Sequence, residues 1–160
     1  MRVYQGTPRR AYADVLRAIG AVLDRGGMRS VLLVEVEEGF IAQGHASTQT
    51  DRRNAWGSLT RVELHFWDAD IAREMQSAVD RRGSEHLAGP NEFAFRLLGG
   101  YIDAHTASDL MALEQEGTWL VRCMPAQAEG HYTFVEFTQE DLGNLAAESS
   151  TARKKSFLRW

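Results

Sequence analysis

The chain has 160 residues, of which 44% are hydrophobic and 25% charged, and its formal net charge is −4. This length and composition are typical of one globular domain with a single core, and they exclude a disordered chain. Sixteen of the 18 basic residues are arginine, and both lysines, Lys154 and Lys155, stand near the C-terminus. Residues 1–150 therefore lack the lysine that P-loop, kinase and Schiff-base chemistry requires.

The charge is divided unevenly along the chain. Residues 151–160 carry four basic and no acidic side chains, whereas residues 1–150 carry 14 basic and 22 acidic ones. Because an acidic surface repels phosphate backbones, we expect no nucleic-acid partner. We expect a single domain over residues 1–150 and a basic, flexible tail over residues 151–160. A single cysteine, no apolar leader and no run of 18 apolar residues predict a cytoplasmic protein without a membrane segment.

The first half of the chain predicts one helix followed by three strands. Thr7-Pro8 is typical of a helix start, apolar residues recur at helical spacing through Leu23, and Gly26-Gly27 ends the helix. Alternating and β-branched residues then predict strands at 30–37, 40–45 and 61–66. The polar segment 46–58 predicts a long loop between the second and third strands.

The second half predicts helices at 69–82 and 93–102, and a further helix capped by Thr106 and Asp109 that ends at Glu116. Two strands follow, at 118–124 and 131–137, and then a helix from Gln139 to about Ser149. The predicted order is α-β-β-β-α-α-α-β-β-α. Because the strands are grouped, we expect an α+β fold with a mostly antiparallel, five-stranded sheet packed by helices.

This order of elements resembles the fold group of the type III secretion chaperones. The resemblance covers most of the chain, and it rests on the order of helices and strands and on no residue motif. It implies a small acidic homodimer that binds other proteins without catalysis. We expect no cofactor other than the divalent metal for which one segment of the chain offers ligands.

One short segment combines side chains that bind divalent metals. Glu63 and His65 share one strand face, and Asp68 and Asp70 follow that strand. Imidazole and carboxylate groups suit a divalent transition metal, so these four residues are the candidate metal ligands. The alternative interpretation is an exposed strand face followed by aspartates that cap a helix.

Two other acidic sites have a catalytic and a structural interpretation. Glu35 and Glu37 share one face of a predicted strand, either as part of a nuclease-like site or as carboxylates that face solvent at a sheet edge. Asp103 and His105 form either a general acid–base pair or a connection that bonds to backbone groups. Cys123 lies in an apolar strand, which favours a core residue over a nucleophile.

Aromatic and arginine residues mark the candidate binding surface. Trp56 stands beside Arg52 and Arg53 in the long loop, and tryptophan and arginine are frequent interface anchors. Trp67 and Trp119 are predicted to lie in the core. The full set of candidate ligand- or partner-binding residues is Arg52, Arg53, Trp56, Trp67, Arg96 and Tyr101.

Three functions remain open at this point. The first is a non-enzymatic, chaperone- or adaptor-like protein-binding domain that acts as a homodimer. The second is a regulatory domain that binds a small molecule or an anion. Its pocket would place one arginine (Arg52, Arg61 or Arg96) beside the aromatic side chains of Phe66, Trp67, Phe93 and Tyr101. The third is a metal-assisted hydrolase that uses the segment from Glu63 to Asp70.

Overall fold

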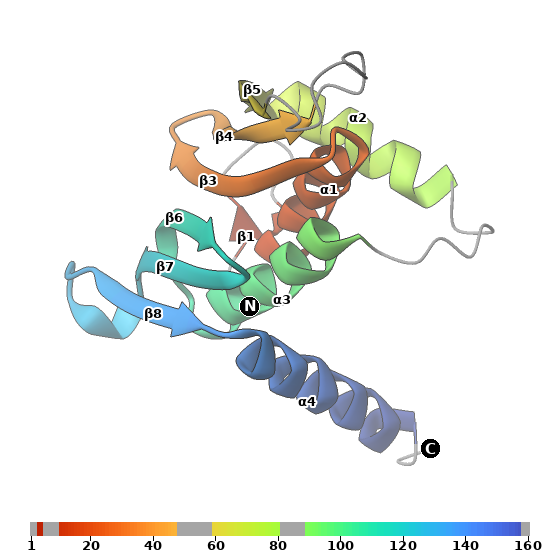
Figure 1. Ribbon diagram of the computed structural model, residues 1–160. Coiled ribbons are helices and arrows are strands. Elements are labelled where there is room, and N and C mark those ends of the chain that lie inside the picture. The colour runs from red at the N-terminus through yellow and green to blue at the C-terminus, as the bar shows by residue number, and fades with distance from the viewer. Residues whose placement is uncertain (1–2, 5–9, 48–58, 81–88, 158–160) are drawn as a thin grey trace.

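The computed structural model describes residues 3–4, 10–47, 59–80 and 89–157 (Figure 1). Its centre is a six-stranded sheet in which every neighbouring pair of strands is antiparallel. The strands lie in the order β5-β4-β3-β6-β7-β8. Their bounds are β3 Met28–Val36, β4 Gly39–Ser47, β5 Leu59–Trp67, β6 Ser108–Gln115, β7 Thr118–Met124 and β8 Thr133–Phe137. Two further strands, β1 (Val3–Tyr4) and β2 (Arg10–Ala11), pair with each other.

The fold is α+β, as predicted, but the sheet has six strands rather than five. The helix predicted after Thr106 is wrong: this segment forms β6, which pairs with β3 and β7. Thr106 and Asp109 have positive φ angles of 49° and 53°, so neither begins a helix. Leu110 and Ala112 face the core, while Met111 between them faces outward. The pairing with β3 and β7 and the burial of these two side chains determine the local structure.

Three helices cover one side of the sheet (Figure 1). They are α1 (Tyr12–Arg25), α2 (Asp68–Asp80) and α3 (Pro90–Ala104). The core lies between these helices and the sheet, where Leu16 and Phe95 pack with inward-facing strand residues such as Phe40 and Val121. We call this side of the sheet the covered face.

The helices α1 and α3 are locked together by two matching devices. Asp103 near the end of α3 accepts hydrogen bonds from the first backbone N–H groups of α1, and Asp24 near the end of α1 does the same for α3. Gly20 and Gly99 lie where each helix meets the other's first turn: a Cβ atom at either position would approach backbone atoms to 2.6 Å. In each helix a glycine is followed four residues later by an aspartate. The glycines allow α1 and α3 to approach closely, and each aspartate caps the start of the other helix.

The last helix, α4, spans Gln139–Phe157. Its start is the predicted one, because the Thr138 N–H and hydroxyl bond to Asp141 Oδ2, and the Thr138 hydroxyl accepts a bond from the Asp141 N–H. Leu142 anchors the helix in the core. The helix ends later than predicted and takes in residues 151–157 of the expected flexible tail.

Candidate functional site

The side of the sheet opposite the three helices carries a continuous apolar surface. Side chains alternate along each strand, so the neighbours of core residues point away from the helices. On this open face, Leu113 is 39% exposed, Leu120 46% and Phe134 65%. We call the following set the apolar patch: Leu32, Val34, Ile41, Met111, Leu113, Leu120 and Phe134.

The strand register shows that six members of the apolar patch are contiguous, while the seventh, Phe134, stands opposite Arg122 on β7. Leu32, Leu113 and Leu120 stand opposite one another on β3, β6 and β7. In the next row, Val34 stands between Ile41 and Met111. Side chains that are directly opposite on neighbouring strands touch, so these rows form one surface across the middle of the sheet.

Polar side chains border the apolar patch at the β5 side. Arg61 Nη2 donates to Gln43 Oε1 over 2.9 Å, and Gln43 Nε2 donates to Glu63 Oε2 over 2.8 Å. His65 Nε2 lies 2.8 Å from Glu63 Oε1. These bonds from His65 and Gln43 hold the pKa of Glu63 below its ordinary value. The β5 border is therefore a row of connected polar side chains that includes both an arginine and a glutamate.

Toward β8, Arg122 stands between Met111 and Phe134 in the strand register and lies over the ring of Tyr132, with 4.4 Å from Cζ to the ring centroid. The Arg122 Nε atom is buried and has no hydrogen-bond partner among the described residues. Glu136 follows on β8, opposite Leu120. An apolar centre with a polar, mixed-charge border is the usual composition of a protein–protein contact surface.

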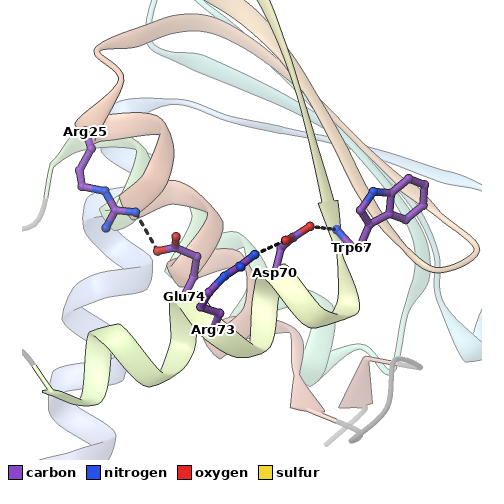
Figure 2. Close-up of polar contacts among 5 residues, drawn as sticks. All are labelled: Arg25, Trp67, Asp70, Arg73 and Glu74. Atoms are coloured by element: carbon purple, nitrogen blue, oxygen red, sulfur yellow. Dashed lines mark hydrogen bonds and ion pairs between the residues drawn. The ribbon is translucent and has the colours of Figure 1, made fainter.

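The four candidate metal ligands do not converge. Glu63 pairs with His65, whereas Asp70 accepts the Trp67 N–H over 3.0 Å and pairs with Arg73 (Figure 2). The Asp68 N–H donates to a backbone carbonyl. In the described part of the chain, no three His, Cys, Asp or Glu side chains form a group that could hold a metal ion. Asp70 thus caps the start of α2, which agrees with the alternative interpretation that the aspartates after the strand cap a helix.

The predicted aromatic pocket is not assembled either. Phe66 lies in the core, while its neighbour Trp67 is 51% exposed on the open face, so the prediction that Trp67 lies in the core is wrong. Tyr101 packs edge-on against Phe137. Arg96 lies over the Phe93 ring, 6.0 Å from its centroid. The remaining candidates fall outside the described residues: Arg52, Arg53 and Trp56.

A cavity of about 350 Å³ lies elsewhere, where the start of α3 meets the β6–β7 turn and the start of α4. Its lining includes the apolar residues Phe93 and Trp119 together with Arg29 and the carboxylates Glu114 and Glu116. Glu114 Oε1 accepts the Gly117 N–H in the turn. The cavity combines aromatic walls with charges of both signs.

Glu35, Asp103 and the cysteine have structural roles in this fold. Glu35 faces the helices and accepts bonds from the Tyr12 hydroxyl and the Leu110 N–H, which replaces both interpretations for this residue, whereas Glu37 follows the end of β3 and is exposed. Asp103 caps α1, and burial raises its pKa although two backbone N–H bonds act in the opposite direction. Cys123 is fully buried, as predicted, and burial raises the pKa of its thiol. Trp119 is buried as predicted.

Sequence reasoning did not identify the apolar patch. The available signal was that β3 and the segment 110–113 are apolar on both faces, which is unusual for a sheet with one solvated face. Leu120 carries the same signal, because it is an exposed apolar residue between the buried Trp119 and Val121. Local spacing instead predicts an ordinary strand at 30–37 and a helix after Thr106, and neither prediction indicates an apolar outer face.

No family model matches this chain, and neither a curated protein nor a solved structure matches it. In the described part of the chain, no helix has the length and apolar character that crossing a bilayer requires.

Proposed function

We propose that the chain is a non-enzymatic protein-binding domain, chaperone- or adaptor-like, that acts as a homodimer. The observation that supports the proposal is the apolar patch on the open face. Large apolar patches on a folded domain mark interaction sites, because their exposure to water is unfavourable. Leu113, Leu120 and Phe134 offer a surface that another protein's apolar side chains can cover.

The form of the patch favours a protein over a small molecule. It spreads over β4, β3, β6, β7 and β8, so it is broad, and its members are side chains of a pleated sheet. Broad apolar surfaces with polar borders suit protein segments, whereas small ligands need concave sites that enclose them. We infer that the partner presents apolar side chains, in an exposed or incompletely folded segment.

The proposal is tested by suppression of aggregation. Lysozyme reduced with dithiothreitol aggregates, and light scattering follows the process. We expect the chain to suppress this aggregation at a near-equimolar ratio. The double variant Leu113→Glu, Leu120→Glu is expected to lose the effect, since two carboxylates would stand in the centre of the apolar patch.

A control with the same added charge separates the patch from a general charge effect. Gln127 and Asn144 are exposed and lie outside the patch, so the double variant Gln127→Glu, Asn144→Glu is expected to act like the wild type. Equal activity of both double variants, or an inactive wild type, would contradict the proposed function. Circular dichroism confirms that each variant is folded.

The second candidate, a small-molecule site, is supported by the cavity that Phe93, Trp119 and Arg29 line. The Arg29 guanidinium would meet an anionic group there. Benzoate is a suitable probe, because it combines an aromatic ring with a carboxylate. If the cavity is such a site, benzoate raises the melting temperature of the wild type and not of Arg29→Ala; an equal response of both proteins excludes it.

A further inference from the structure

The two edges of the six-stranded sheet differ in how well they are protected from further strand pairing. β8 has five residues, whereas β5 has nine and pairs with β4 at nine consecutive positions without a register shift. The β5 segment contains no proline, glycine or lysine. Proteins usually protect edge strands with such residues, with bulges or by keeping them short, because an unprotected edge pairs with another strand.

The β5 edge also exposes apolar surface that a further strand would cover. Val62 and Leu64 point to the covered face and are only partly buried, although they pack on the core. Among the residues that the structure describes, no strand lies beyond β5. A strand added there would bury these two side chains more fully and would satisfy a row of backbone groups.

We propose that a second copy of the chain occupies this edge, so that two β5 strands pair antiparallel about a two-fold axis at Leu64. This inference rests on the proposed function in one respect: it assigns the surface through which the homodimer forms. Closed two-fold dimers require a surface that complements itself. The β5 sequence around Leu64 meets this requirement.

On the open face, the pairing centred at Leu64 aligns complementary side chains. Glu63 stands opposite His65 of the second copy, and Arg61 stands opposite its Trp67. Each contact occurs twice, since the axis exchanges the two chains. A carboxylate opposite an imidazole that can bond to it, and a guanidinium over an aromatic ring, are favourable cross-strand partners.

On the covered face, the same pairing places apolar side chains opposite one another. Leu64 meets Leu64 of the second copy, and Val62 meets its Phe66. A pairing centred at Glu63 would instead set the two Glu63 carboxylates opposite each other, and like charges directly opposite are unfavourable. The register centred at Leu64 is therefore the one that the side chains favour.

The helix that follows β5 is compatible with this arrangement. α2 begins at Asp68, which stands opposite Thr60 of the second copy, so each helix leaves at an end of the paired segment. Contacts of Asp70 with Trp67 and of Glu74 with Arg25 hold α2 against its own chain (Figure 2). The axis is perpendicular to the sheet, so both apolar patches face the same side and remain free for a partner protein.

Light scattering coupled to size exclusion tests the pairing. The wild type is expected to have twice the 17.9 kDa mass of one chain. His65→Glu places two glutamates opposite Glu63 residues, and we expect the dimer dissociation constant to rise about tenfold or more. The double variant Glu63→Lys, His65→Glu places a lysine opposite each glutamate and is expected to restore the dimer.

Two further variants keep the test specific. Glu136→Arg changes a charge on β8, at the opposite edge, and is expected to leave the dimer unchanged. Leu64→Cys is expected to form a disulfide-linked dimer under mild oxidation, whereas Glu136→Cys is not. The buried Cys123 is present in both proteins and does not react.

Three results would overturn the pairing: a monomeric wild type, a dimer that His65→Glu leaves intact, or a dimer that Leu64→Cys fails to cross-link. A monomeric wild type would also exclude the homodimer of the proposed function, whereas the other two results would leave that function standing. A dimer built through another surface that still suppresses lysozyme aggregation through Leu113 and Leu120 would exclude the β5 pairing alone. A β5 dimer without that activity would exclude the protein-binding function alone.

Discussion

The two faces of the sheet bear similar side chains but have different surroundings. On β7, Leu120 is 46% exposed, while Val121, the next residue, is fully buried under the helices. On β6, Ala112 is buried and Leu113 is 39% exposed. The difference lies in the covering elements, because α1, α2 and α3 all lie on the same side (Figure 1).

This comparison separates what each face of the sheet contributes. The covered face supplies stability, since burial of apolar area is the main favourable contribution to folding. The open face is as apolar as a buried surface, but no helix in the described part of the chain covers it. A sheet that is apolar on both faces is typical of burial on both faces, which supports a partner on the open one.

The largest expected effect concerns the helix pair that covers the sheet. Gly99→Ala would place a Cβ atom 2.6 Å from the first turn of α1, so we expect a loss of up to about 3 kcal/mol in the free energy of unfolding. Gly100→Ala is the matched control, because a Cβ atom at Gly100 has open space. Alanine favours a helix over glycine, so this variant is expected to gain about 0.5–1 kcal/mol. Urea unfolding measures both; equal effects would refute the close approach.

The next prediction compares the two faces directly. Val121→Ala opens a cavity in the core and is expected to cost about 2 kcal/mol of stability. Leu120→Ala, one residue away, is expected to change stability by less than about 0.5 kcal/mol, because its side chain is exposed. Thermal and urea unfolding of the two variants measure the contrast. Similar losses in both would show that the open face is already covered within the chain.

A smaller effect is expected at the reciprocal caps. Asp103→Asn keeps the size of the side chain but removes one of the oxygen acceptors that bind the Tyr12 and Ala13 N–H groups. We expect a loss of about 1 kcal/mol, typical of a weakened helix cap. Asp14→Asn, at an exposed position in the first turn of α1, the turn that Asp103 caps, provides the control. If the two variants unfold at the same urea concentration, Asp103 does not act as a cap.

The smallest predicted effect is a pH dependence at the start of α4. Bonds from the Thr138 backbone and hydroxyl lower the pKa of Asp141. Because the folded pKa lies below the unfolded one, this contribution is present above the unfolded pKa and is lost as the pH falls through the folded pKa. Asp141→Asn is therefore expected to lose less stability than the wild type on acidification below about pH 4. The melting temperatures of the wild type and of Asp141→Asn, measured as the pH is lowered, check this prediction.

Much of the fold follows from local patterns in the sequence. The apolar spacing in α1 and the Thr138–Asp141 cap each specify their element, and the structure confirms them. The segment 108–115 does not follow in this way, because its residues suit a helix and become a strand by pairing with β3 and β7. Pairing between distant segments is not visible in local spacing.

The candidate site was harder to predict than the fold. Glu63 and His65 were correctly placed on one strand face, but Asp70 is held by Arg73 and the Trp67 N–H. Trp67 was expected in the core, since tryptophan is largely buried on average. The exposure of Leu120 and Phe134 depends on which face the helices cover, and this is a property of the assembled chain.

The most direct test of the open face is the affinity for an unfolded chain. Fluorescence anisotropy of labelled, reduced and carboxymethylated lysozyme measures binding by the wild type, by Leu120→Glu and by the charge-matched Gln127→Glu. The wild type and Gln127→Glu are expected to bind equally, and Leu120→Glu about tenfold more weakly or worse. Equal affinity of all three proteins, or no binding by the wild type, would contradict the assignment of protein binding to this face.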